Sequence, residues 1–220
     1  MSETFQRPYE QRGPLQVETT GSITEVAGGL AVVALSIISL ARADNGFLLA
    51  IAGIVLGVAL LAEGGTVVAE LSNALTASGE TGSGTEFSGM SMEFMAGTAA
   101  IVLGVLAVIG IDTVTLLAAT VIAVGGAMIV AASGVRHLNA VRLRTGPASP
   151  VAQQVTHAAS ANAANAEALA GIAGIVLGIV ALSTPAHGGV LTAVGLLVLG
   201  AALTVNGATL TGRTARMFAR

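Results

Sequence analysis

Long apolar runs separated by polar segments dominate the chain. Three of these runs are near copies of one another, with glycine or alanine at one-turn spacing, at 50–61, 97–108 and 171–182. A bilayer core takes about 20 apolar residues of helix, within a range of about 17–25. Six runs meet that requirement and predict an all-α integral membrane protein with six transmembrane helices, at 23–41, 46–62, 94–111, 114–132, 166–182 and 188–205.

The links between these spans alternate between short and long. Only 42–45, 112–113 and 183–187 separate the members of each successive pair, and short links make neighbouring helices antiparallel. We therefore predict three helical hairpins, at 23–62, 93–132 and 166–207. The remaining parts are predicted as a cytoplasmic arm (1–22), a flexible polar connection (63–92), an arginine-bearing interfacial connection (133–165) and a basic tail (208–220).

The hairpins resemble one another in sequence. Each first helix carries a glutamate four residues before a glycine, and this alignment also pairs leucines in the second helices, at Leu49, Leu117 and Leu191. A competing alignment follows the glycine-rich run itself and equates the second span with the third and fifth. The first alignment predicts a hairpin repeat in which all three units share one orientation, unlike an inverted transporter repeat.

Composition agrees with a bilayer and offers little for catalysis. The 220 residues are 54% hydrophobic and 10% charged, with mean hydropathy +0.85, which is too little charge to cover a water-soluble surface. Cysteine is absent, and the sequence has no phosphate-binding loop, catalytic triad, zinc motif or dinucleotide fingerprint. We expect a non-enzymatic protein with no cofactor, no metal and no nucleic-acid partner.

Arginine placement predicts the orientation. With six spans, the arm, the two long connections and the tail share one side and hold every arginine except Arg42. Because cytoplasmic loops carry the excess of basic residues, both termini are predicted to be cytoplasmic. The absence of lysine and the abundance of alanine, glycine and valine favour a prokaryotic plasma membrane.

Small residues at four-residue spacing predict close helix packing. Lipid gives helices no hydrophobic reason to associate, so they meet where small side chains let the backbones approach. Such faces either pack within one bundle or contact another subunit, which leaves a homo-oligomer or a larger membrane assembly as predicted partners beside the bilayer. The residues predicted to form them are Gly53, Gly57, Ala100, Gly104, Ala119, Ala123, Ala127, Gly174 and Gly178.

Three carboxylates, Glu25, Glu93 and Glu167, lie at the same predicted mouth of the odd-numbered spans. Two interpretations remain open. A negative charge in the first turn of a helix is favoured by the helix dipole, which would make each glutamate a simple cap. Alternatively, the three form a cytoplasmic carboxylate ring that binds a proton or a cation. No ionisable residue lies at mid-depth in the spans, which counts against a carrier that relays charge.

The third hairpin resembles one known family. Its sequence from Gly174 to Pro185, followed by the apolar run from Val190 to Gly200, is similar to the repeat of HdeD-type membrane proteins. The resemblance implies about six spans in short hairpin repeats and a role in acid resistance at the bacterial inner membrane. Our first functional hypothesis is a structural or packing subunit, and the alternative is an acid-stress or channel-like protein of this type.

Overall fold

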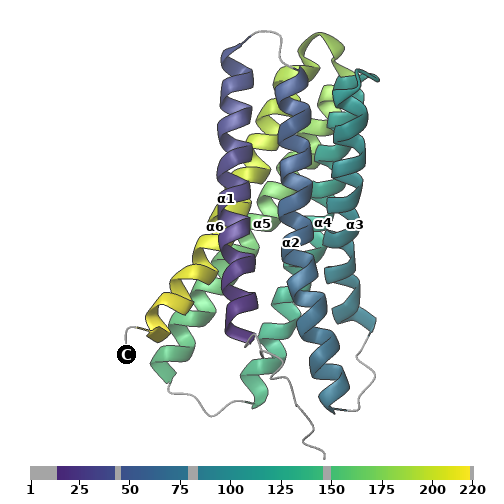
Figure 1. The fold of residues 1–220 in the computed structure, drawn as a ribbon. Coiled ribbons are helices and arrows are strands. Elements are labelled where there is room, and N and C mark those ends of the chain that lie inside the picture. Colours follow the sequence, from purple (N-terminus) through teal and green to yellow (C-terminus); the bar gives the residue numbers. More distant parts are fainter. Residues whose placement is uncertain (1–13, 43–45, 79–83, 146–149, 219–220) are drawn as a thin grey trace, which may run out of the picture.

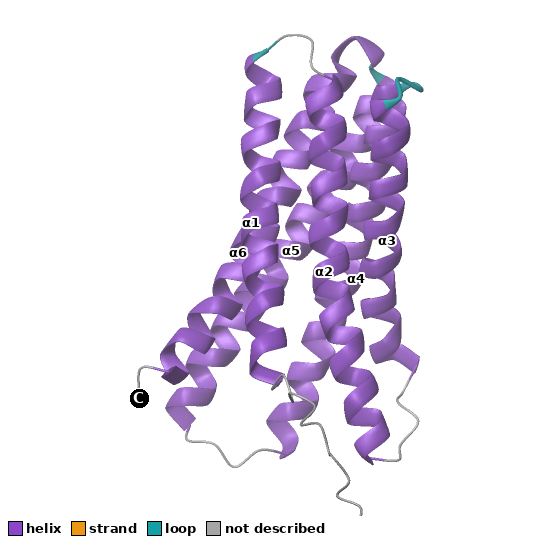
Figure 2. Ribbon diagram, viewed as in Figure 1, coloured by secondary structure: helices purple, strands orange, loops and turns teal. Residues whose placement is uncertain are grey.

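The described structure is a bundle of six long helices. The computed structural model describes residues 14–42, 46–78, 84–145 and 150–218. Within them it contains α1 (Pro14–Ala41), α2 (Gly46–Ser78), α3 (Gly84–Val108), α4 (Thr113–Thr145), α5 (Pro150–Ser183) and α6 (Gly188–Phe218), with a short 3₁₀ turn, η1 (Pro185–His187). The described residues include no strand (Figure 2), and the all-α prediction is confirmed.

The helices form a closed ring in chain order. Each helix packs against the next, and α6 packs back against α1, so the first and last helices run side by side (Figure 1). The even-numbered helices α2, α4 and α6 also contact one another across the ring. In the apolar stretches of α2, α4 and α6, 44%, 50% and 44% of residues are buried, against 28% in α1 and 33% in α5. The even-numbered helices are therefore the inner ones.

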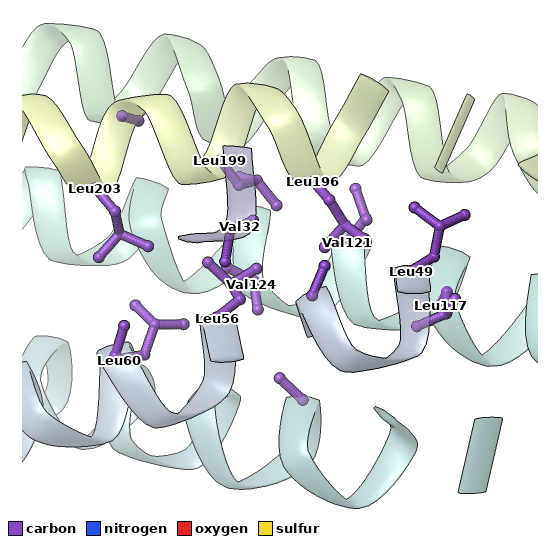
Figure 3. Packing of buried hydrophobic residues seen from close by; sticks show 14 of the residues in the cluster. Val32, Leu49, Leu56, Leu60, Leu117, Val121, Val124, Leu196, Leu199 and Leu203 are labelled. Carbon is purple, nitrogen blue, oxygen red and sulfur yellow. The ribbon is translucent and has the colours of Figure 1, made fainter. Parts of the chain in front are cut away.

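Apolar side chains fill the space between the inner helices. Leu56, Val124 and Leu199, one from each inner helix, are completely buried. Leu60 and Leu203 lie toward one end of this core, and Leu49 and Leu117 toward the other (Figure 3). Such interdigitation supplies most of the dispersion contact that holds helices together where lipid offers no hydrophobic driving force.

Five helices contain a stretch long and apolar enough to cross a membrane, and the apolar part of α3, Met92–Val108, is shorter. Large apolar side chains point outward mainly from the odd-numbered helices, as with Leu30, Val102 and Val176, each more than half exposed. A soluble surface would not carry so many. The fold is that of a multi-pass helical membrane protein.

The link between α3 and α4 shows why this hairpin turns so tightly. Gly110 has φ +91°, a conformation that glycine adopts at little cost. Its N–H donates to the Ala107 carbonyl, and the N–H of Ile111 donates to the Leu106 carbonyl. This pair of bonds satisfies the last carbonyls of α3 and ends the helix.

The helices extend well beyond the predicted spans. Most of 63–92, which we expected to be a flexible connection, is helical, because α2 continues to Ser78 and α3 begins at Gly84. The 208–220 tail is likewise helical as far as Phe218. Once a helix has nucleated in the apolar segment, each added residue costs little, and the glutamates, alanines and leucines of these segments favour its propagation.

Candidate carboxylate cluster

Three close backbone contacts determine where the glutamates lie. Gly29 of α1, Gly97 of α3 and Gly171 of α5 each lie against the carbonyl oxygen of a glycine on the neighbouring inner helix, respectively Gly200, Gly57 and Gly125. A Cβ atom on Gly97 would lie 2.8 Å from the Gly57 oxygen, closer than side chains tolerate. Each glutamate lies one helical turn before such a contact, and the close approach of the two backbones draws it into the bundle.

All three predicted carboxylates are buried. Glu25 is 1% exposed, and Glu93 and Glu167 are each 6% exposed. They lie well beyond the first turns of α1, α3 and α5, which begin at Pro14, Gly84 and Pro150. The dipole effect fades within the first turn. The interpretation of these residues as helix caps is therefore wrong, because the helices begin earlier than the apolar pattern indicates.

A fourth glutamate and an asparagine complete the group. Asn206 of α6 donates from Nδ2 to Oε1 of Glu63 on α2, at 3.0 Å, across 143 residues of sequence. Asn206 also interacts with Glu25. Glu63 follows the predicted span 46–62 and Asn206 follows the predicted span 188–205, so the apolar pattern alone does not connect them. We call Glu25, Glu63, Glu93, Glu167 and Asn206 the carboxylate cluster.

The four carboxyl groups are close enough to interact electrostatically. Glu63 acts on each of the other three, and Glu93 also interacts with Glu25 and Glu167. Oε1 of Glu25 is buried and has no hydrogen-bond partner. An isolated ionised carboxylate costs many kcal/mol in a low-dielectric interior unless a cation or a proton compensates it.

The basic side chains whose surroundings the structure describes lie too far from the cluster to neutralise its carboxylates. Arg42 and His187 are both exposed and belong to the links at the opposite end of the bundle. Along α1 alone, Arg42 is about 25 Å from Glu25 at 1.5 Å per residue. Among the described residues, no group of three or more His, Cys, Asp or Glu side chains has the arrangement needed to hold a metal ion.

The predicted packing residues contact helices of the same chain. Gly57 lies against Gly97 and Ile101 of α3, and Gly104 lies against Ile54 of α2. Gly53 faces Leu117 of α4, whereas Ala100 is fully buried.

The predicted packing residues of α4 and α5 differ in how far they are buried. Gly174 touches Leu199 of α6 and Val121 of α4, and Gly178 touches Ile122 of α4. The alanine stripe of α4 is split, with Ala127 buried, Ala119 half-buried and Ala123 exposed. Every glycine of the predicted set is therefore used within the bundle.

Hydroxyl groups in the helices are mostly satisfied locally. Thr120, Thr192 and Thr204 donate to the carbonyl one turn back, at 2.8–2.9 Å, which is the usual behaviour of threonine in an apolar helix. The buried Ser36 hydroxyl has no partner, and we have no physical account of it.

Comparisons of the chain with protein-family models, curated proteins and solved structures found no match.

Proposed function

We propose that this chain is a membrane protein that binds protons at the carboxylate cluster and responds to acid through them. One observation carries the proposal. Oε1 of Glu25, on a side chain 1% exposed, lies without a hydrogen-bond partner among three other carboxyl groups. A proton on the group removes most of the cost of its burial, because a neutral carboxyl is far cheaper to bury than an ion.

The surroundings favour a proton over a metal ion. Calcium takes about six to eight oxygen ligands in flexible geometry, and magnesium takes about six in octahedral geometry. The described His, Asp and Glu side chains form no such group, and among the described residues the Asn206 amide donates a hydrogen bond to Glu63. A proton needs only one oxygen. It can also be shared between neighbouring carboxyl groups, as in paired-carboxylate sites.

We also propose that the bundle is a threefold repeat of hairpins. The contact glycines support it, since Gly57, Gly125 and Gly200 occupy corresponding places on the inner helices. Six residues after each of them stand Glu63, Ala131 and Asn206, respectively. The cluster is then an unequal version of a symmetric site, with an acid, an alanine and an amide at the three inner positions.

We also propose that the cluster lies at the cytoplasmic end of the bundle. Six spans place the cluster at the same end as both termini, and the arginine distribution puts that end in the cytoplasm. The cluster would then report on cytoplasmic acidity in a prokaryotic plasma membrane. This non-enzymatic role agrees with the acid resistance that the resemblance to HdeD-type proteins implies.

Infrared spectroscopy of the purified protein tests proton binding. The carbonyl stretch of a protonated carboxyl group is separate from the bands of a carboxylate. We expect the wild-type protein at neutral pH to show protonated carboxyl groups, and a variant with Gln at positions 25, 63, 93 and 167 to lack them. Asp112→Asn is the matched control, because it removes an exposed carboxylate at the other end. A wild-type spectrum without protonated carboxyl groups refutes the proposal.

A structural role in a larger assembly is the second proposal. Its support is the outward apolar surface of α1, α3 and α5, which includes Ile37, Met95 and Leu169. The predicted glycine faces lend it no support, because they are used within the chain.

A further inference from the structure

Glu63 differs from the other glutamates of the cluster in its access to solvent. It is half-buried, whereas Glu25, Glu93 and Glu167 are almost completely enclosed. Glu63 lies near the end of the apolar stretch of α2, which closes at Gly64. Among the four carboxyl groups it is the one with the largest exposed fraction.

Glu63 is also the electrostatic centre of the cluster. Among the carboxyl groups that act on Glu25, Glu93 and Glu167, it has the largest effect on each. The three buried glutamates come from the outer helices α1, α3 and α5, while Glu63 comes from the inner helix α2. Glu63 therefore interacts electrostatically with a carboxyl group from each of the three outer helices.

Asn206 fixes the orientation of this carboxyl group. Its Nδ2 donates to Oε1 of Glu63 at 3.0 Å, which holds this carboxyl oxygen toward α6. This bond joins α6 to α2, two inner helices that also pack against each other.

We propose that Glu63 is the carboxylate through which protons reach the buried glutamates, and that Asn206 is its positioning residue. The inference rests on the proposed proton binding and assigns its route. A hydronium ion gives its proton to the Glu63 carboxylate and leaves as water. The new O–H bond then breaks as the proton passes to Glu25, Glu93 or Glu167, and the Glu63 carboxylate is restored.

The other groups at this level are consistent with the route. Glu25 of α1, Glu93 of α3 and Glu167 of α5 interact electrostatically with Glu63, and Asn206 of α6 donates a hydrogen bond to it. The described residues of α4 at this end, Met128 and Ala132 among them, are not titratable. A competing proton carrier is therefore not found among the described side chains around Glu63.

A stopped-flow pH jump of the purified protein, from alkaline to neutral pH, tests the route, because the buried glutamates must start ionised in order to take up protons. A pH-sensitive dye reports both the amount of proton uptake and its rate. Proton transfer through a positioned side chain is typically worth about 10²–10⁴ in rate, so Glu63→Gln should slow uptake by the buried glutamates about 100-fold or more. Glu63→Asp keeps a carboxylate and should recover part of the rate. Asn206→Leu should slow uptake without changing the number of protons bound.

The controls separate this inference from the proposed function. Asn162→Leu makes the same chemical change at an exposed position of α5, and Asp112→Asn removes an exposed carboxylate. Both should behave as wild type. If Glu63→Gln does not fold, Asn206→Leu decides the matter alone. Wild-type uptake rates in Glu63→Gln or in Asn206→Leu overturn the route while leaving proton binding intact. A wild-type protein that takes up no more protons than the four-glutamine variant overturns both.

Discussion

Adjacent glycines on α4 give a sharp prediction about the packing that encloses the cluster. A Cβ atom on Gly125 would lie 2.6 Å from the carbonyl oxygen of Gly171 and 3.2 Å from the backbone nitrogen of Ile175, so Gly125→Ala forces α4 and α5 apart. Gly126 has nothing within 4 Å of the same added atom. The two variants make the same chemical change one residue apart, one inside the contact between α4 and α5 and one outside it.

The expected effects have opposite signs. Overpacking a close contact typically costs about 1–3 kcal/mol, and the obstacle here is backbone that cannot rotate away. Gly126→Ala meets no obstacle and gains the helix preference of alanine, about 0.5–1 kcal/mol. Because Gly125→Ala gains the same helix preference, the free energies of unfolding of the two variants should differ by the overpacking cost alone, about 1–3 kcal/mol.

Reversible unfolding in mixed micelles, followed by far-ultraviolet circular dichroism, measures this difference. Both variants should retain the wild-type helical signal before the transition. If Gly125→Ala proves as stable as Gly126→Ala, or more so, then α4 and α5 do not meet at Gly125 and Gly171. The placement of Glu167 one turn away would then lose its basis.

Two further predictions concern the whole protein. If acid response is its role, a deletion strain should survive acid less well than its parent, and the wild-type gene should restore survival where the four-glutamine variant does not; equal survival of parent and deletion strain contradicts that role. If the outer helices instead form a subunit interface, mass measurement after gentle detergent extraction should show a homo-oligomer or a complex with other proteins, and a monomer rejects the structural proposal.

The periodic features of the fold could be predicted from the sequence. Apolar runs of membrane length and short links indicated helices and antiparallel pairs, and both depend only on local sequence. The ends of the helices were harder to predict, because Glu63–Ser78 lacks the apolar pattern and is nevertheless part of α2. The alanine stripe of α4 misled for a geometric reason. A row at strict four-residue spacing drifts by about 40° per step around a helix, so Ala123 faces outward while Ala127 is buried.

Three of the five residues of the cluster were accessible from sequence. The shared spacing of a glutamate and a following glycine singled out Glu25, Glu93 and Glu167 before any helix was placed. Glu63 and Asn206 have no such signal, because their meeting depends on closure of the ring between α6 and the first hairpin. The signal that could have found them is their shared spacing, because Glu63 follows Gly57 by six residues and Asn206 follows Gly200 by six. The leucine alignment hides this spacing. Gly57 and Gly200 align only when Leu49 of the first hairpin is paired with Thr192 of the third, one residue after Leu191.

The most direct test of the account is the infrared difference spectrum between wild type and Glu25→Gln at neutral pH. Glu25 is the most deeply buried of the four glutamates and has an unpartnered oxygen. We predict that the substitution removes a protonated-carboxyl band, while Asp112→Asn leaves that region of the spectrum unchanged. If Glu25→Gln removes only carboxylate bands, Glu25 is ionised in the folded protein, and the cluster does not hold its protons as proposed.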